Sequence, residues 1–210
     1  MTALSSLAPS PTLGQALTSY RRRSGFPPDG GASERLSWVR LGPLALPLPN
    51  PPARQVALVR HDAHHVLLDQ DASLRGEAVV AAFELGSGCG GVWVAWVLQP
   101  QALVAGLLCP RLTVEALALG RRSANFYRQL DPSEWLDTPL VALRRRLLPD
   151  APPEPGWGDL LRCLAWGALG GLMLLLVAAL LALPLLLLWP LSLWQGARLT
   201  ARAQVAVAGA

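Results

Sequence analysis

The pattern of hydrophobic and polar positions predicts a helical hairpin near the middle of the chain. Apolar side chains recur at helical spacing over residues 54–70. Residues 69–73 combine turn formers with a helix N-cap, Asp71 or Ser73. A second helix is predicted to follow and to end in the glycines of residues 86–91, because glycine favours a helix C-terminus. Two helices joined by a short turn follow from this pattern.

The segments that flank this hairpin carry weaker patterns. We expect residues 1–53 to be an irregular N-terminal segment, with short strands as the alternative over residues 24–53, where prolines and glycines interrupt helices and sheet ladders. Residues 91–109 contain no charged side chain but are interrupted by a proline flanked by glutamines, which favours two short buried helices over a membrane span. These helices are candidates for lining a groove for an apolar ligand. Residues 112–148 alternate apolar and charged positions, as amphipathic helices do. The predicted fold class is all-α, with residues 54–148 as the helical domain.

Residues 160–195 are predicted to be a membrane anchor. Apart from Arg162, the stretch up to residue 194 has no charge, and it is longer than the about 20 apolar residues that one transmembrane helix needs. One long tilted helix and a tight hairpin therefore both remain open. A proline-rich linker over residues 149–159 precedes the anchor, and a tail over residues 196–210 follows it. Four tryptophans lie near the two ends, as is typical of membrane interfaces: Trp157, Trp166, Trp189 and Trp194.

The composition favours a protein that is bound to a membrane. Hydrophobic residues make up 52% of the 210 residues, and all 18 positively charged residues are arginines. The arginine groups lack the interleaved aromatic residues of a nucleic-acid-binding surface, so membrane lipids are the expected partner and nucleic acid is not. The three cysteines are far apart and odd in number, which indicates free thiols in a reducing compartment. We expect no cleavable secretory signal, and we expect a bacterial inner membrane with the soluble domain on the cytoplasmic side.

All three histidines of the chain lie within residues 61–65, on the first helix of the predicted hairpin. His61 and His65 stand at i and i+4 and therefore point to one side of that helix. Glu77 follows His65 after eleven residues, and imidazole and carboxylate groups bind first-row divalent metals. An unbroken helix would separate Glu77 from His65 by about 18 Å, so the turn is needed to bring Glu77 back. The sequence predicts a metal site.

Three neighbouring side chains are candidates for supporting that site. Asp62 lies at i, i+3 to His65 and would either coordinate the metal or orient an imidazole. Glu84 lies two turns after Glu77 on the same face, which makes it a candidate outer ligand or acid/base group. His64 points about 100° away from His65 and is expected to be a neighbour that supports the ligands from outside their coordination sphere.

The histidines have two other interpretations besides a metal site. A histidine pair at helical spacing is often only a polar patch, or a core histidine that has found a hydrogen-bond partner. Membrane hydroxylases and desaturases also carry histidine boxes beside apolar segments, but they need several boxes, and this chain has three histidines in all. Zinc is the expected metal, with iron and manganese as alternatives that the spacing does not separate.

The signature within residues 61–77 resembles the H-D-x-x-H-x11-E motif of the coenzyme Q (ubiquinone) biosynthesis protein four family. The likeness covers residues 54–148, and the Pro/Gly-rich residues 24–53 and the apolar segment after Pro155 depart from it, which indicates a divergent member. The matching positions of the motif are His61, Asp62, His65 and Glu77. The matching positions of the second half are Glu84, a Gly120-Arg121-Arg122 turn, Asn125, Tyr127, and Leu140 with Leu143 and Arg144.

This resemblance implies a mostly helical protein at a membrane surface, with a divalent metal, often taken as zinc, on the four motif residues His61, Asp62, His65 and Glu77. Members of the family are associated with ubiquinone synthesis, as organisers of an enzyme complex that binds long isoprenoid lipids and with oxidative decarboxylation of the ring intermediate. An isoprenoid lipid or a prenylated quinone precursor is thus the implied ligand, with other biosynthetic enzymes as implied partners.

The sequence does not decide between an enzyme and a scaffold. In the enzymatic case Glu84 or Asp62 would move protons, although no catalytic residue is identified. The alternative is a membrane-anchored scaffold or lipid-binding protein with a structural metal and no role in quinone synthesis. Histidine and carboxylate donors favour chemistry, because structural zinc sites favour cysteine.

Overall fold

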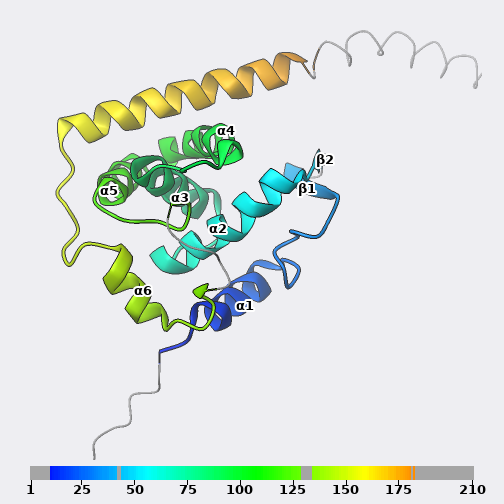
Figure 1. The fold of residues 1–210 in the computed structure, drawn as a ribbon. Helices are drawn as coiled ribbons and strands as arrows, with labels where there is room; N and C mark the ends of the chain where they lie inside the picture. The colour runs from blue at the N-terminus through cyan, green and yellow to red at the C-terminus, as the bar shows by residue number, and fades with distance from the viewer. Residues whose placement is uncertain (1–9, 42–43, 129–133, 181, 183–210) are drawn as a thin grey trace, which may run out of the picture. The chain divides into compact units, whose positions relative to one another are not determined.

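A computed structural model describes residues 10–41, 44–128, 134–180 and 182 (Figure 1). The described chain is mostly helical, as predicted, and it divides into two compact units, Met1–Gly170 and Gly171–Ala210. The elements of the first unit are, in chain order, α1 (Leu13–Ser24), β1 (Leu36–Leu41), β2 (Leu44–Pro49), α2 (Pro52–Leu68), α3 (Leu74–Ser87), α4 (Trp93–Leu103), the 3₁₀ helix η1 (Val104–Leu108), α5 (Pro110–Arg121) and α6 (Leu140–Leu147).

Helix α3 lies at the centre of the first unit, between α4 and α5 (Figure 1). Its side chains are buried from Ala78 to Leu85. Two glycines let the backbones of α3 and α5 approach each other closely. A Cβ atom at Gly86 would overlap the carbonyl of Leu117, and one at Gly120 would overlap the carbonyl of Phe83. Glycine at both positions therefore sets the distance between the two helices.

The predicted helix–turn–helix over residues 54–91 is confirmed. Pro52 occupies the first turn of α2, where its missing N–H costs nothing, and Asp69 ends the helix in the left-handed conformation with φ 55°. Ser73 then caps α3, because its hydroxyl accepts a hydrogen bond from the N–H of Gly76. The chain reverses within this short turn, so the side chains of α3 face those of α2.

The prediction of an irregular segment over residues 1–53 is wrong for residues 13–24, which form α1. Thr12 and Gln15 make a capping box at its start, and Gly25 ends it at φ 71°. The helix has few apolar residues, but they share one buried face: Leu13, Leu17 and Tyr20. These three contacts anchor an otherwise polar helix on the domain.

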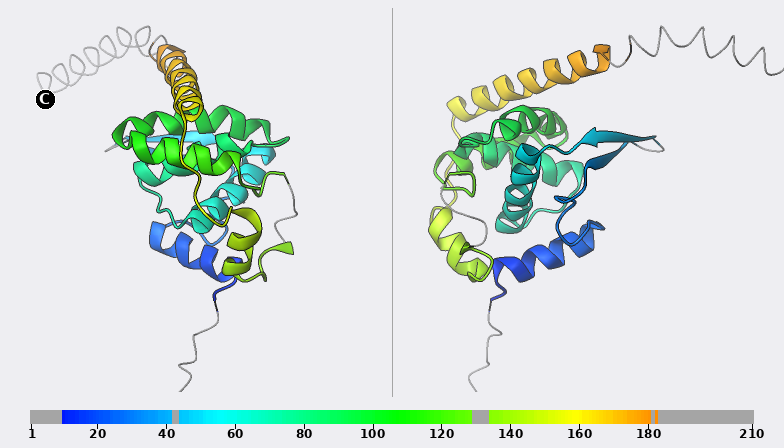
Figure 2. Two further views of the ribbon diagram at one scale, coloured as in Figure 1. Left: turned by 90° about the vertical axis from the view of Figure 1, so that its left-hand side faces the viewer. Right: turned by 45° about the vertical axis from the view of Figure 1, so that its right-hand side comes forward.

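The short-strand alternative for residues 24–53 is confirmed, so the fold is mostly helical rather than all-α. Strands β1 and β2 pair in antiparallel register from Leu36 opposite Pro49 to Leu41 opposite Leu44, and they run side by side in Figure 2. Asn50 holds the base of this hairpin, since its buried side-chain amide donates to the carbonyls of Gly31 and Glu34 over 3.0 and 2.8 Å.

The region predicted as two short buried helices, residues 91–109, forms α4 and η1. Pro100 lies inside α4 and does not end it, and the chain tightens into η1 only after Leu103. The helices are buried on one side alone, because Trp93 and Leu107 are 62% and 80% exposed. The prediction was right about two elements and wrong about their full burial, and the predicted groove stays a prediction.

Beyond α6, one helix of the described residues, Trp157–Leu180, is long and apolar enough to cross a membrane. Its 24 residues correspond to about 36 Å, and 6% of its most apolar window is buried. The rest of the predicted anchor and the predicted tail lie outside the described residues, apart from residue 182. The choice between one span and a hairpin therefore falls outside them as well.

Candidate metal centre

Helices α2 and α3 bring together the ligand atoms of His61, His65 and Glu77, which all lie within 4.8 Å of one another. Nε2 of His61 is 3.0 Å from Oε2 of Glu77 and 3.2 Å from Nε2 of His65. Nε2 of His65 is 3.4 Å from Oε1 of Glu77. The i, i+4 spacing on α2 aligns the two rings, and the turn before α3 returns the carboxylate to them, as the sequence predicted.

These separations fit the coordination shell of a small divalent ion. Zinc binds imidazole nitrogen and carboxylate oxygen at about 2.0–2.2 Å, so two ligand atoms of a tetrahedral site lie about 3.3 Å apart. The two histidine nitrogens are 3.2 Å apart, close to this value, and the two oxygens of Glu77 approach them separately, Oε2 to within 3.0 Å of His61 and Oε1 to within 3.4 Å of His65. The side chains of His61, His65 and Glu77 could therefore hold such an ion as three protein ligands with little rearrangement.

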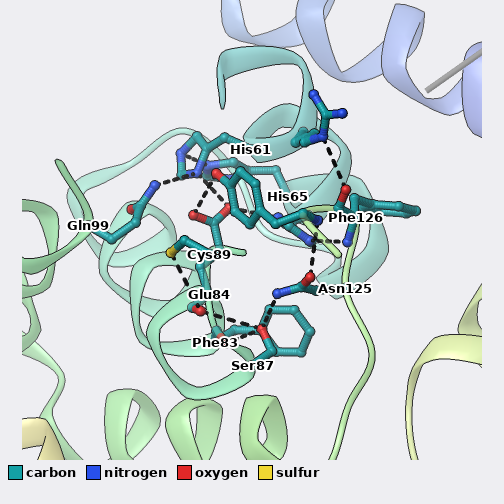
Figure 3. Close-up of polar contacts among 12 residues, drawn as sticks. His61, His65, Phe83, Glu84, Ser87, Cys89, Gln99, Asn125 and Phe126 are labelled. Atoms are coloured by element: carbon teal, nitrogen blue, oxygen red, sulfur yellow. Dashed lines mark hydrogen bonds and ion pairs between the residues drawn. The ribbon is translucent and has the colours of Figure 1, made fainter. Parts of the chain in front are cut away.

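Glu84 fixes the orientation of His61 from the side opposite the ligand atoms (Figure 3). Its fully buried carboxylate accepts a hydrogen bond from Nδ1 of His61 over 3.0 Å. A proton on Nδ1 leaves Nε2 of the same ring to face Glu77 and His65. Metal-binding histidines commonly carry such a carboxylate partner, which fixes the tautomer and increases the basicity of the ligating nitrogen.

His64 belongs to the same buried network but not to the ligand group. The backbone N–H of Phe126 donates to Nε2 of His64 over 3.1 Å, so Nδ1 carries the proton and donates to Glu84 over 2.7 Å. Tyr127 adds a third hydrogen bond, from its hydroxyl to Oε2 of Glu84 over 3.1 Å. Three donors thus hold one buried carboxylate in place.

The carboxylates of the site are held in their ionised form. Burial on its own would raise the pKa of Glu84, but the charge of His61 and the hydrogen bonds from His61 and His64 lower it to about 2. Burial would also raise the pKa of Glu77, and hydrogen bonds from His61 and His65 hold it well below its ordinary value. For His61, burial is the largest single influence and opposes protonation, but the charges and hydrogen bonds of Glu84 and Glu77 together outweigh it and raise the pKa. The site is therefore a compact set of opposite charges.

Asp62, the remaining residue of the predicted ligand set, faces a different partner. Its Oδ2 accepts a hydrogen bond from Nε of Arg21 on α1 over 2.8 Å, and both side chains are largely buried. Burial raises the pKa of Asp62 more than the hydrogen bond from Arg21 lowers it. The group of converging ligand atoms does not include Asp62. Its role as a ligand stays a prediction.

Two further side chains contact the histidine rings. Tyr20 of α1 stacks on His65, with ring centroids 5.2 Å apart and an interplanar angle of 24°. Gln99 of α4 points toward His61, with Nε2 3.3 Å from Nδ1 of that ring (Figure 3). The side-chain oxygen of Gln99 and Nδ1 of His65 are buried and have no hydrogen-bond partner among the described residues. The site is thus enclosed by residues of α1 and α4.

Sequence reasoning missed Tyr20, Arg21 and Gln99, because nothing in their local pattern connects them with the histidines. The capping box at Thr12 and Gln15 was the available signal for α1, and it was overlooked. Asn125 and Tyr127 were identified only through the family resemblance. The side chain of Asn125 donates to the carbonyl of Gly88 over 2.7 Å and accepts from the N–H of Tyr127 over 3.0 Å. It therefore fixes the backbone that presents Tyr127 to Glu84.

Comparisons of the chain with protein families, with curated proteins and with solved structures find no match.

Proposed function

We propose that this protein binds a divalent metal ion, with zinc as the first expectation, through His61, His65 and Glu77 on a membrane-associated helical domain. The observation that carries the proposal is the convergence of Nε2 of His61, Nε2 of His65 and the Glu77 carboxylate: the three ligand atoms lie within 4.8 Å of one another, and the two nitrogens are 3.2 Å apart, close to the spacing in a tetrahedral shell. The Glu84 carboxylate behind His61 supports it, because metal-binding imidazoles commonly have such a partner.

Three protein ligands favour a reactive site over a structural one. Structural zinc sites are closed by four protein ligands, whereas catalytic sites keep a position for water or substrate. While Arg21 holds Asp62, this site has three. An ion bound there would act as a Lewis acid towards an oxygen of the substrate. Glu77 and the two imidazoles would hold the ion in place.

The proposed membrane association rests on the helix Trp157–Leu180. A helix from the core of a soluble protein would be mostly buried, whereas the most apolar window of this one is 6% buried. Apolar side chains stand out from it, including Leu161 at 64% and Leu175 at 69% exposure. Such a surface is stable in lipid and costly in water.

An isoprenoid lipid or a prenylated quinone precursor is the proposed ligand, in keeping with the resemblance to the coenzyme Q biosynthesis protein four family. In the enzymatic form the site would act in removing the ring carboxyl group. In the scaffold form the metal would fix α2 and α3 while the protein presents the lipid to partner enzymes. A lipid-binding protein with a structural metal and no quinone role is the second candidate.

Metal analysis of the purified full-length protein tests the site. We expect one equivalent of metal after reloading with zinc, and its loss in His65→Ala and Glu77→Ala. Glu115→Ala is the matched control, because this glutamate lies on α5 in an exposed pair with Arg111. A wild-type protein without stoichiometric metal, or His65→Ala and Glu77→Ala proteins that keep it, would overturn the proposal.

Incubation with prenylated aromatic acids separates the two forms. Release of carbon dioxide by the metal-loaded protein, lost in Glu77→Ala, would favour the enzyme. Tight binding of the prenylated acid without release would favour the scaffold. A protein that binds zinc but neither converts nor binds these acids would favour the candidate without a quinone role.

A further inference from the structure

Helix α4 and η1 carry an apolar surface that no part of the described chain covers. It consists of five exposed side chains, named here the α4–η1 surface: Trp93, Val97, Leu98, Leu107 and Leu108, with exposures of 62%, 39%, 37%, 80% and 74%. Residues 91–109, which include all five, contain no charged side chain. An exposed apolar surface without charged side chains is expected to be covered by a binding partner or by a membrane.

The opposite side of α4 is buried and lines the candidate metal centre. Val94, Ala95 and Gln99 are each at most 5% exposed, and Gln99 contacts His61. Helix α4 therefore separates the metal centre from whatever covers the α4–η1 surface.

The helix Trp157–Leu180 ties α4 to the part of the chain that would enter a membrane. The rings of Trp96 and Trp166 have centroids 5.8 Å apart. A Cβ atom at Gly170 would overlap the carbonyl of Pro100, so the two backbones touch there. Trp166 and Gly170 belong to both this apolar helix and the first unit, so a bilayer that reaches residues 166–170 also lies beside α4.

The two ends of the α4–η1 surface suit the boundary between lipid and water. Trp93 stands at one end, and tryptophan is enriched at the level of the lipid headgroups. Arg111 follows the exposed leucines at the other end, and its side chain is 90% exposed. Arginine beside an apolar patch reaches the headgroups while the patch enters the acyl region.

From these contacts we infer that the α4–η1 surface lies in the phospholipid bilayer, so that α4 forms the wall between lipid and the metal centre. This inference rests on the proposed membrane association. It deepens that proposal, because it identifies the face of the domain through which an apolar ligand would approach His61.

Nitroxide accessibility in the full-length protein tests the inference. The protein, with Cys109→Ser and Cys163→Ser to remove the partly exposed thiols, is placed in phosphatidylcholine–phosphatidylglycerol vesicles. A spin label is attached at Leu107→Cys or Leu98→Cys. The matched control is Leu74→Cys at the start of α3, which is 67% exposed and precedes Arg75. Collisions are measured with oxygen, which enters lipid, and with a nickel chelate, which stays in water.

We expect the ratio of oxygen to nickel collisions to be several-fold higher at positions 107 and 98 than at position 74. Equal ratios would place the surface in water and overturn the inference. Low collision rates with both reagents would indicate a protein partner and would also overturn it. Vesicle flotation and zinc content distinguish failure of this inference from failure of the proposed function. Protein that does not float with the vesicles refutes membrane association itself. Zinc-loaded protein that floats but gives equal ratios refutes only the position of this surface.

Discussion

Arg21 on α1 and Asp62 on α2 form a buried ion pair across 41 positions of sequence, with Nε and Oδ2 2.8 Å apart. Gly30 passes directly beside this pair, and a Cβ atom there would overlap Oδ2 of Asp62. The glycine also has φ 71°, a conformation that other residues rarely adopt. The carboxylate is therefore enclosed by α1 and the loop after it, on a side of α2 where it would have to leave Arg21 to reach a metal.

Asp62→Asn is expected to keep the metal, whereas Glu77→Gln is expected to lose it. Asparagine retains an oxygen that accepts from Arg21, and the three converging ligand atoms are unchanged. The zinc that remains bound after reloading and desalting is measured for both variants. If Asp62→Asn loses zinc to the same extent as Glu77→Gln, Asp62 is a ligand and Arg21 must release it when the ion binds.

Arg21→Met is expected to destabilise the domain by about 3 kcal/mol, because it leaves the Asp62 carboxylate buried without its partner. The thermal unfolding midpoint of the apo protein in detergent micelles measures the effect. Arg23→Met, at an exposed position of the same helix, is the control and should leave the midpoint unchanged. The double variant Arg21→Met with Asp62→Leu should recover most of the loss, because no charge then remains buried. A double variant as unstable as Arg21→Met would show that the ion pair is not the cause.

The parts of the site that the sequence predicted are those with local signals. Asp69 and Ser73 end one helix and begin the next within a few residues, and this turn alone returns Glu77 to His65. Arg21 has no such signal, because its partner lies 41 positions away and only the packing of α1 on α2 brings them together. Helix α1 itself was missed, since three buried residues among small and polar ones make a weak pattern.

The contacts of the buried Glu84 carboxylate could likewise be predicted only in part from the sequence. The spacing from Glu77 to Glu84 predicted that both face α2, and both do contact His61. It did not predict that His64 would bond Glu84, because that contact needs the backbone N–H of Phe126 to fix the ring from the other side. Pairing between segments this far apart depends on tertiary packing, which no short window of sequence contains.

Glu84→Gln is expected to weaken zinc binding by about 10-fold to 100-fold without removing a ligand. A glutamine would offer one oxygen to the donors of His61, His64 and Tyr127, so His61 would lose its charged partner and its fixed tautomer. Competition with a chromophoric chelator measures the dissociation constant at fixed pH and salt. Glu115→Gln should not change it, since that side chain lies on α5 and pairs with Arg111. An unchanged affinity in Glu84→Gln would mean that the carboxylate supports the fold but not the metal.

Gly120→Ala is expected to destabilise the domain by about 1–3 kcal/mol, because the added methyl group has no room at the crossing of α3 and α5. It would meet the backbone carbonyl of Phe83, which cannot rotate away as a side chain could. Since α3 also carries Glu77 and Glu84, moving it away from α5 should shift both carboxylates relative to α2 and weaken zinc binding together with stability. Gly91→Ala is the matched control, as its position is exposed and has nothing within 4 Å of the new methyl group. Thermal unfolding and chelator competition on both variants check the prediction, and equal unfolding midpoints for the two would contradict a close crossing at Gly120.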